Sequence, residues 1–153
     1  MSNQQYTQKS MEAIQNAQRL ASERGHQQLE QAHLLLSLLE MPEGLIPQLL
    51  TRMNGSADAL RQGAEAALQK LPQVRGMARE EGKVYVSAAL DKALRTAADE
   101  AARMKDEYIS VEHLFLALIK EADSTLSPLF RQQQITEAAF LQALSAVRGA
   151  ARV

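Results

Sequence analysis

His33-Leu34-Leu35-Leu36-Ser37-Leu38-Leu39 is the stretch that decides the fold, together with its counterpart 80 residues later, His113-Leu114-Phe115-Leu116-Ala117-Leu118-Ile119. Neither stretch has the one-sided apolar stripe of a surface helix, because nearly every position is apolar. A helix that is apolar on all sides needs other elements to cover it. The sequence therefore predicts two central, buried helices, one in each half of the chain.

These two stretches belong to a longer internal duplication. An offset of 80 residues aligns Ala13 with Ala93, Ala17 with Ala97, Leu29 with Ile109, and Leu36 with Leu116. One extra residue then aligns Pro47 with Pro128 and Leu60 with Leu141. Agreement that keeps its register over so many positions indicates a repeat. We expect each half to be a four-helix unit, and the two halves to pack with pseudo-twofold symmetry.

Composition favours an all-α fold. Alanine and leucine contribute 47 of the 153 residues, whereas valine and isoleucine contribute 11. The first pair favours helix and the second favours strand. We expect one domain over residues 1–153, with repeat one at 6–71, a connector at 72–86 and repeat two at 87–148. Caps and chain-breaking residues delimit eight predicted helices near residues 7–24, 31–40, 45–53, 56–71, 87–101, 110–119, 127–130 and 136–147.

Charge and residue usage exclude several classes of protein. The 17 basic and 18 acidic side chains nearly cancel, whereas a general nucleic-acid binder carries a basic excess. There is no cysteine, which excludes disulfides and thiolate sites. The first residues lack the apolar centre of a signal peptide, and no apolar run approaches the ~18 residues of a membrane span. We expect a cytoplasmic protein with no nucleic-acid or membrane partner.

Three motifs that suggest chemistry do not meet the requirements of that chemistry. The segment from Gly76 to Val84 has one residue too many for a phosphate-binding loop, and no Ser or Thr follows Lys83. His33 and His113 occupy equivalent repeat positions, so duplication explains them without a metal ion. The acidic side chains lie in cap or surface positions and form no acid–base pair. We therefore expect no catalytic residue, no metal and no cofactor.

The duplicated pattern resembles the Clp N-terminal repeat family. The resemblance is carried by Tyr108-Ile109-Ser110-Val111-Glu112-His113-Leu114-Phe115-Leu116-Ala117-Leu118 and by Leu29-Glu30-Gln31-Ala32-His33-Leu34-Leu35-Leu36-Ser37-Leu38-Leu39. Within the family, the connector Leu71-Pro72-Gln73-Val74-Arg75-Gly76 is most similar to the branch of ClpB-type disaggregases, and Tyr6-Thr7-Gln8-Lys9-Ser10 also fits that branch. The resemblance covers about residues 6–148.

The resemblance implies a docking domain of an AAA+ protein disaggregase. Such a domain recognises unfolded or aggregated polypeptide, or an adaptor protein, for a hexameric ATPase ring. This sequence contains no Walker A or Walker B element, so we expect a monomeric domain without ATPase activity, with ATP bound only by ATPase modules elsewhere. Three alternatives remain: a free-standing Clp-repeat adaptor or regulator, the N-terminal domain of another Clp-type unfoldase, and a small helical enzyme.

The resemblance also points to substrate-handling residues. The ClpB branch has a polar trio at positions that correspond here to Thr7, Asp106 and Glu112. Helix capping and the helix dipole provide structural roles for Thr7 and Glu112, and aspartate is common in loops such as the one expected at Asp106. We expect Thr7 to lie near the segment from Asp106 to Glu112, with a shallow apolar groove between them. Tyr6 and Tyr108 are further candidates for lining that groove.

Overall fold

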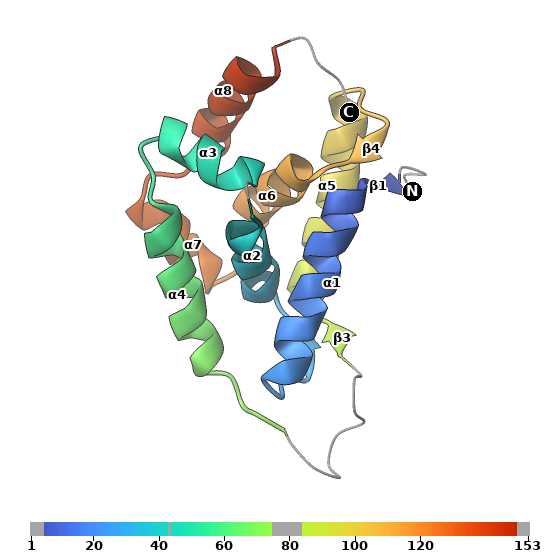
Figure 1. Cartoon of the computed structure of the whole chain (residues 1–153), viewed down its shortest axis with the longest axis vertical. Coiled ribbons are helices and arrows are strands. Elements are labelled where there is room, and N and C mark those ends of the chain that lie inside the picture. Colours follow the sequence, from blue (N-terminus) through green and yellow to red (C-terminus); the bar gives the residue numbers. More distant parts are fainter. Residues whose placement is uncertain (1–4, 43, 75–83, 150–153) are drawn as a thin grey trace.

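The computed structural model describes residues 5–42, 44–74 and 84–149. These residues form eight α-helices and four two-residue strands (Figure 1). The prediction of an all-α fold is confirmed. The elements in chain order are β1 (Gln5–Tyr6), α1 (Gln8–Glu23), β2 (Gln28–Leu29), α2 (Gln31–Glu40), α3 (Leu45–Arg52), α4 (Ala57–Gln69), β3 (Tyr85–Val86), α5 (Ala88–Arg103), β4 (Tyr108–Ile109), α6 (Val111–Lys120), α7 (Leu126–Gln132) and α8 (Glu137–Arg148).

Helices α2 and α6 lie in the middle of the molecule, as their composition predicts (Figure 1). Every residue of α2 from Gln31 to Leu39 is buried, and so is every residue of α6 from Val111 to Leu118. Helix α2 packs on α1, α4 and α6, and α6 packs on α5, α3 and α8. Each buried leucine contributes about 1.5–3 kcal/mol of apolar transfer free energy. These two helices therefore hold the surrounding six together.

The helix starts are specified locally by side-chain caps. Thr7, Ser56, Ser87 and Thr136 each accept a hydrogen bond from the backbone N–H three residues later, which satisfies a donor that the helix itself leaves free. Three of these caps, at Thr7, Ser56 and Ser87, are predicted by the sequence. Thr7 and Ser87 occupy equivalent positions in the two repeats. The periodicity and the caps together therefore account for the helices without reference to tertiary structure.

The four strands were not predicted. Strand β1 pairs in parallel with β4, and β2 pairs in parallel with β3. Each pair joins the segment that precedes the first helix of one half to the segment that precedes the second helix of the other half. Two residues are too few to show an alternating pattern, so these strands leave no sequence signal. They nevertheless bring the starts of α1 and α6 together.

The 80-residue offset continues further than the sequence alignment assumed. Helices α1 and α5 have bounds that differ by 80 residues, and so do α2 and α6. The extra residue placed before Pro128 is not needed: the caps Ser56 and Thr136 again differ by 80. Leu60 and Phe140 are both fully buried. Leu60 therefore corresponds to Phe140, and its alignment with the half-buried Leu141 was wrong.

Of the motif predictions, the one for a phosphate-binding loop concerns residues that the structure largely does not describe. Most of the segment from Gly76 to Val84 lies outside the described residues, because 75–83 are not among them. Within the described residues, no group of three His, Cys, Asp or Glu side chains is arranged to hold a metal ion. The described helices also include none with the length and apolar character needed to cross a membrane.

Candidate functional site

An apolar groove of about 420 Å³ lies where four helix ends meet. It is formed by the starts of α1, α3 and α6 and by the end of α2. Its walls are mainly aliphatic, and the only charged side chains among its lining residues are Lys9 and Glu112. The residues that line this groove are Thr7, Gln8, Lys9, Leu38, Met41, Gly44, Leu45, Ile46, Gln48, Ser110, Val111 and Glu112. A concave, largely apolar surface with a few polar groups is the usual form of a binding site.

Thr7 lies at the groove because strand β1 pairs with β4. The backbone N–H of Thr7 donates to the carbonyl of Ile109 at 3.0 Å. The Thr7 hydroxyl accepts from the backbone N–H of Ser10 and donates to the Ser10 hydroxyl, both at 3.1 Å. These bonds occupy the hydroxyl as the cap of α1. The proximity of Thr7 to the 106–112 segment is as expected.

Glu112 also lines the groove, in the first turn of α6. Only 7% of its side chain is exposed. Its carboxylate is 3.9 Å from Nε of Arg148, which is longer than a hydrogen bond. The N-terminal end of a helix favours negative charge, so α6 also helps to hold this carboxylate. The groove therefore has a nearly buried acid at one edge and aliphatic walls.

Asp106 does not line the groove, contrary to expectation. Its side chain is fully buried, and it binds two other groups. The Asp106 carboxylate receives hydrogen bonds from His113 Nε2 at 2.7 Å and from Arg148 Nη2 at 2.7 Å. Asp106 therefore acts on the groove only indirectly, by holding Arg148 near Glu112.

The hydrogen bonds determine which ring nitrogen of His113 carries the proton. Nδ1 of His113 accepts from the backbone N–H of Ser110 at 2.9 Å, so that nitrogen is unprotonated. Nε2 therefore carries the hydrogen and donates it to Asp106. Burial lowers the pKa of His113, while the hydrogen bond and charge of Asp106 oppose that shift. His113 is a structural part of the second half, as expected.

Neither tyrosine lines the groove. Tyr6 is half-buried, packs against the core and pairs with Ile109 in the β1–β4 ladder. Burial raises the pKa of Tyr6, and the negative charge of Asp91 raises it further. Tyr108 is 43% exposed and pairs with Gln5. Side chains alternate in direction along a strand, so the rings of Tyr6 and Tyr108 point to opposite faces of this ladder.

The first half contains a related buried pair, His26 and His33. His33 Nδ1 accepts from the backbone N–H of Glu30 at 2.9 Å, so Nε2 of His33 donates to Nδ1 of His26, also at 2.9 Å. Burial lowers the pKa of His33 to about 4, with further contributions from the charges of His26 and Arg24. The ring of His33 is therefore neutral near pH 7, and His26 takes the place that Asp106 has in the second half.

Sequence reasoning missed the apolar wall and Arg148. Met41, Leu45 and Val111 contribute to the wall, yet each resembles an ordinary core residue in the sequence. A signal for Val111 does exist, because the duplication breaks there: its counterpart at the 80-residue offset is Gln31. Arg148 carries no comparable signal, because its contacts with the 106–112 segment depend on how α8 packs.

The counterpart of the groove in the other half is smaller: a hollow of about 240 Å³ that Glu30, Ala32, Ser124 and Thr125 help to line. Gln31 is fully buried, and its amide Nε2 donates to the carbonyls of Ala89 at 3.0 Å and Glu121 at 2.8 Å. Its Oε1 accepts from the backbone N–H of Asp123 at 2.9 Å. Val111 has no polar atom to make such bonds. We call the region around Gln31 the sealed surface.

Comparison with known proteins gives one family. Residues 5–133 match the Clp repeat (R) N-terminal domain. Chaperone protein ClpB of Bacillus cereus is 44% identical over 149 residues, which are 97% of this chain and 17% of that protein. ClpB of Nitratidesulfovibrio vulgaris is 38% identical with the same coverage. The chain thus spans about a sixth of the length of these curated relatives, and the predicted resemblance to the Clp repeat family and to ClpB is confirmed.

Solved structures agree on the fold. The crystal structure of the Hsp104 N-terminal domain from Candida albicans matches with a TM-score of 0.81 at 21% identity, over 97% of this chain and 95% of that one. A complex of the ClpV N-domain with VipB peptide matches with a TM-score of 0.69 at 18% identity, over 91% of this chain and 88% of that one. At these identities, the likeness shows a shared all-α fold.

Proposed function

The chain belongs to the Clp repeat (R) N-terminal domain family, and from this premise we propose that it is a docking module for a ClpB-type disaggregase. The module binds apolar segments of unfolded or aggregated polypeptide, or of an adaptor protein. It binds and does not catalyse, and it needs no cofactor. The whole protein's ATP-driven disaggregation, its hexameric ring and its cytoplasmic location belong to the same proposal, as does a monomeric state for this domain alone.

The apolar groove is the observation that carries the proposal. Its aliphatic walls match the side chains that an unfolded protein exposes and a folded one hides. Burial of apolar surface contributes about 25 cal/mol per Å² and needs no particular sequence in the ligand. Such a groove therefore supports weak, broad recognition of many chains. The ClpV N-domain, whose solved complex contains a VipB peptide, is a structural relative that binds a defined peptide.

We assign different roles to the three polar residues. Thr7 and Glu112 both line the groove, and they orient a bound chain through its backbone amides or polar side chains. Asp106 is a positioning residue: it holds Arg148, and Arg148 holds the carboxylate of Glu112. The aliphatic walls supply most of the affinity. Tyr6 and Tyr108 lie outside the groove, and we propose no direct substrate contact for them.

The experiment is a titration of the protein with a carboxymethylated, permanently unfolded polypeptide, followed by fluorescence anisotropy. Leu45→Glu places a charge in the apolar wall and should weaken binding about tenfold or more, because an unpaired charge would be buried under the ligand. Glu112→Ala should weaken it less, because only an orienting group is lost. Thermal melts establish that each variant is folded.

The duplication supplies a matched control for Thr7. Ser87 is the equivalent cap of α5, and it lies on the sealed surface. Thr7→Ala and Ser87→Ala should each cost about 1 kcal/mol of stability, because each removes one N-cap. Only Thr7→Ala should weaken binding. The proposal fails if Leu45→Glu binds the unfolded polypeptide as the parent does, or if Thr7→Ala and Ser87→Ala change binding equally.

A further inference from the structure

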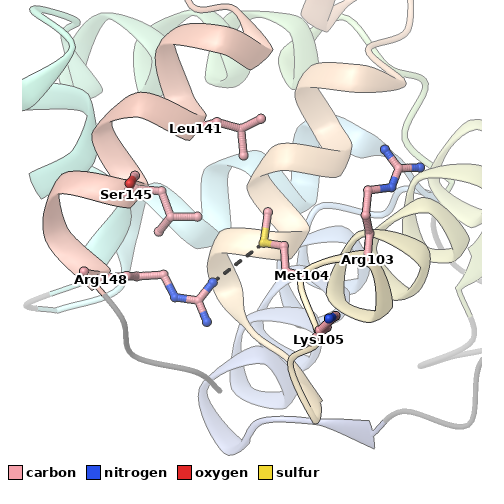
Figure 2. Close-up of a pocket in the computed structure, with 8 residues that line it drawn as sticks. Arg103, Met104, Lys105, Leu141, Ser145 and Arg148 are labelled. Atoms are coloured by element: carbon pink, nitrogen blue, oxygen red, sulfur yellow. Dashed lines mark hydrogen bonds between the residues drawn. The ribbon is translucent and has the colours of Figure 1, made fainter.

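A second hollow, separate from the groove, lies between the C-terminal end of α5 and the C-terminal part of α8. Its volume is about 400 Å³, within the range of about 300–1,000 Å³ typical of small ligand sites. Met104, Leu141 and Leu144 give it an apolar floor, and Arg103, Lys105 and Arg148 give it a basic rim. No carboxylate is among its lining residues. Figure 2 shows Arg148 extended from α8 towards the sulfur of Met104, 3.7 Å from Nη1.

The equivalent place in the first half is closed by an ion pair. Arg24 corresponds to Met104 at the 80-residue offset, and Glu65 corresponds to Ser145. The Arg24 guanidinium binds both carboxylate oxygens of Glu65, which joins the end of α1 to α4. The second half has lost both members of this pair. The hollow is therefore a local departure from the repeat and not a property of the fold.

The backbone at Lys105 is a second, independent observation. Lys105 follows the end of α5 with φ +61°, in the left-handed region that favours glycine. The equivalent residue in the first half is Gly25, with φ +73°. A lysine is thus held in a conformation where the other repeat uses glycine. Strain of this kind is often retained where a side chain has a binding role. Among the described residues, Lys105 takes part in no ion pair.

We propose that this hollow is a docking site for an acidic segment of a partner protein, one that carries an apolar side chain flanked by aspartate or glutamate. The apolar side chain lies on Met104 and Leu141, and the carboxylates pair with Lys105 and Arg103. Arg148 is held by Asp106 and contributes through its outer face. Arg103 Nη1 already pairs with Glu100 at 3.3 Å, so Lys105 is the rim cation most open to a new carboxylate. Charge complementarity with this basic rim selects an acidic ligand over a basic or neutral one. The site is independent of the proposed groove function and extends it to a second partner.

The test uses two labelled twelve-residue peptides: one with two leucines flanked by glutamates, and the same peptide with lysines in place of the glutamates. We expect saturable binding of the acidic peptide only, with an affinity that falls as salt rises, because rim charges are screened. Arg103→Glu combined with Lys105→Glu should weaken binding about tenfold or more, because like charges then face each other. Equal binding of both peptides, or no saturation at millimolar peptide, would overturn the proposal.

Two further variants separate docking from folding. Met104→Arg combined with Ser145→Glu installs the ion pair of the first half, fills the hollow and should abolish binding. Lys105→Gly should raise the melting temperature, because the backbone strain is relieved, and should weaken binding about threefold through the lost charge. If Lys105→Gly binds the acidic peptide as the parent does, the rim cations only complement the helix ends, and the proposal is wrong. Val111→Gln, which alters the groove, should leave acidic-peptide binding unchanged.

Discussion

The groove and the sealed surface occupy equivalent places in the repeat, yet the groove has a volume of about 420 Å³ and the hollow at the sealed surface about 240 Å³. The main difference is one residue at the start of the second helix of each half. Val111 leaves the groove with an aliphatic wall, whereas Gln31 makes three hydrogen bonds across the sealed surface. Met41 on the groove side likewise corresponds to Glu121. Duplication thus supplied two copies of a scaffold, and a few side chains decide which copy carries the larger, apolar groove.

The buried pairs beneath these two surfaces differ in the same way. His26 and His33 form a pair of two imidazole rings, whereas Asp106 and His113 form a pair that includes a carboxylate and recruits Arg148. The second arrangement connects α6 to the end of α8 and reaches Glu112 at the groove. His26 carries no carboxylate, so it cannot pair with an arginine as Asp106 does. The charged network therefore reaches the groove through Glu112.

The largest expected effect comes from breaking that network. Asp106→Ala leaves the hydrogens of His113 and Arg148 without their acceptor, so we expect it to lower the free energy of unfolding by about 3 kcal/mol. His26→Ala removes one imidazole partner of His33, and should cost about 1 kcal/mol. Urea denaturation measures both values. Adding Arg148→Met to Asp106→Ala should recover part of the loss, and equal losses for Asp106→Ala and His26→Ala would remove the distinction between the two pairs.

The second prediction concerns pH. The pKa of His33 is lowered to about 4 from the ordinary 6.5, so the unfolded chain binds a proton that the folded chain excludes. The resulting stability is fully present above pH 6.5 and is lost as the pH falls towards 4, by up to about 3 kcal/mol. Urea denaturation at pH 7 and pH 4.5 measures this loss.

A variant copied from the other half sharpens the pH prediction. His26→Asp gives His33 the carboxylate partner that His113 has, which should raise the pKa of His33 and reduce its share of the acid destabilisation. We expect the difference in stability between pH 7 and pH 4.5 to be smaller in this variant than in the parent. If the two proteins lose the same stability, the residue at position 26 does not set the contribution of His33 to the pH dependence.

The smallest expected effect concerns the hydrogen bonds that Gln31 makes at the sealed surface. Gln31→Ala leaves the carbonyls of Ala89 and Glu121 and the N–H of Asp123 without a partner, and water can reach part of the space vacated. We expect a loss of about 2 kcal/mol in the free energy of unfolding. Val111→Ala, the matched change in the groove, removes two methyl groups and should cost about 1 kcal/mol. A loss for Gln31→Ala no greater than that for Val111→Ala would show that the amide does not hold the sealed surface closed.

The sequence by itself determined the all-α fold, the eight helices and the family. These follow from local information: the excess of alanine and leucine, the caps at Thr7 and Ser87, and the apolar stretches at 33–39 and 113–119 are all readable in order along the chain. The duplication was also visible, although a chance match of Pro47 with Pro128 displaced the register by one residue. Burial of Leu60 and Phe140 restores the offset of 80.

Only the tertiary structure decided where the polar residues act. Asp106 and Glu112 are six residues apart, yet Asp106 turns inward to His113 and Arg148 while Glu112 lines the groove. Arg148 reaches both from the far end of the chain. The short strands that bring Thr7 to the start of α6 contain two residues each. The direction of a side chain and a contact between distant segments depend on how whole helices pack, and no local pattern in the sequence encodes that packing.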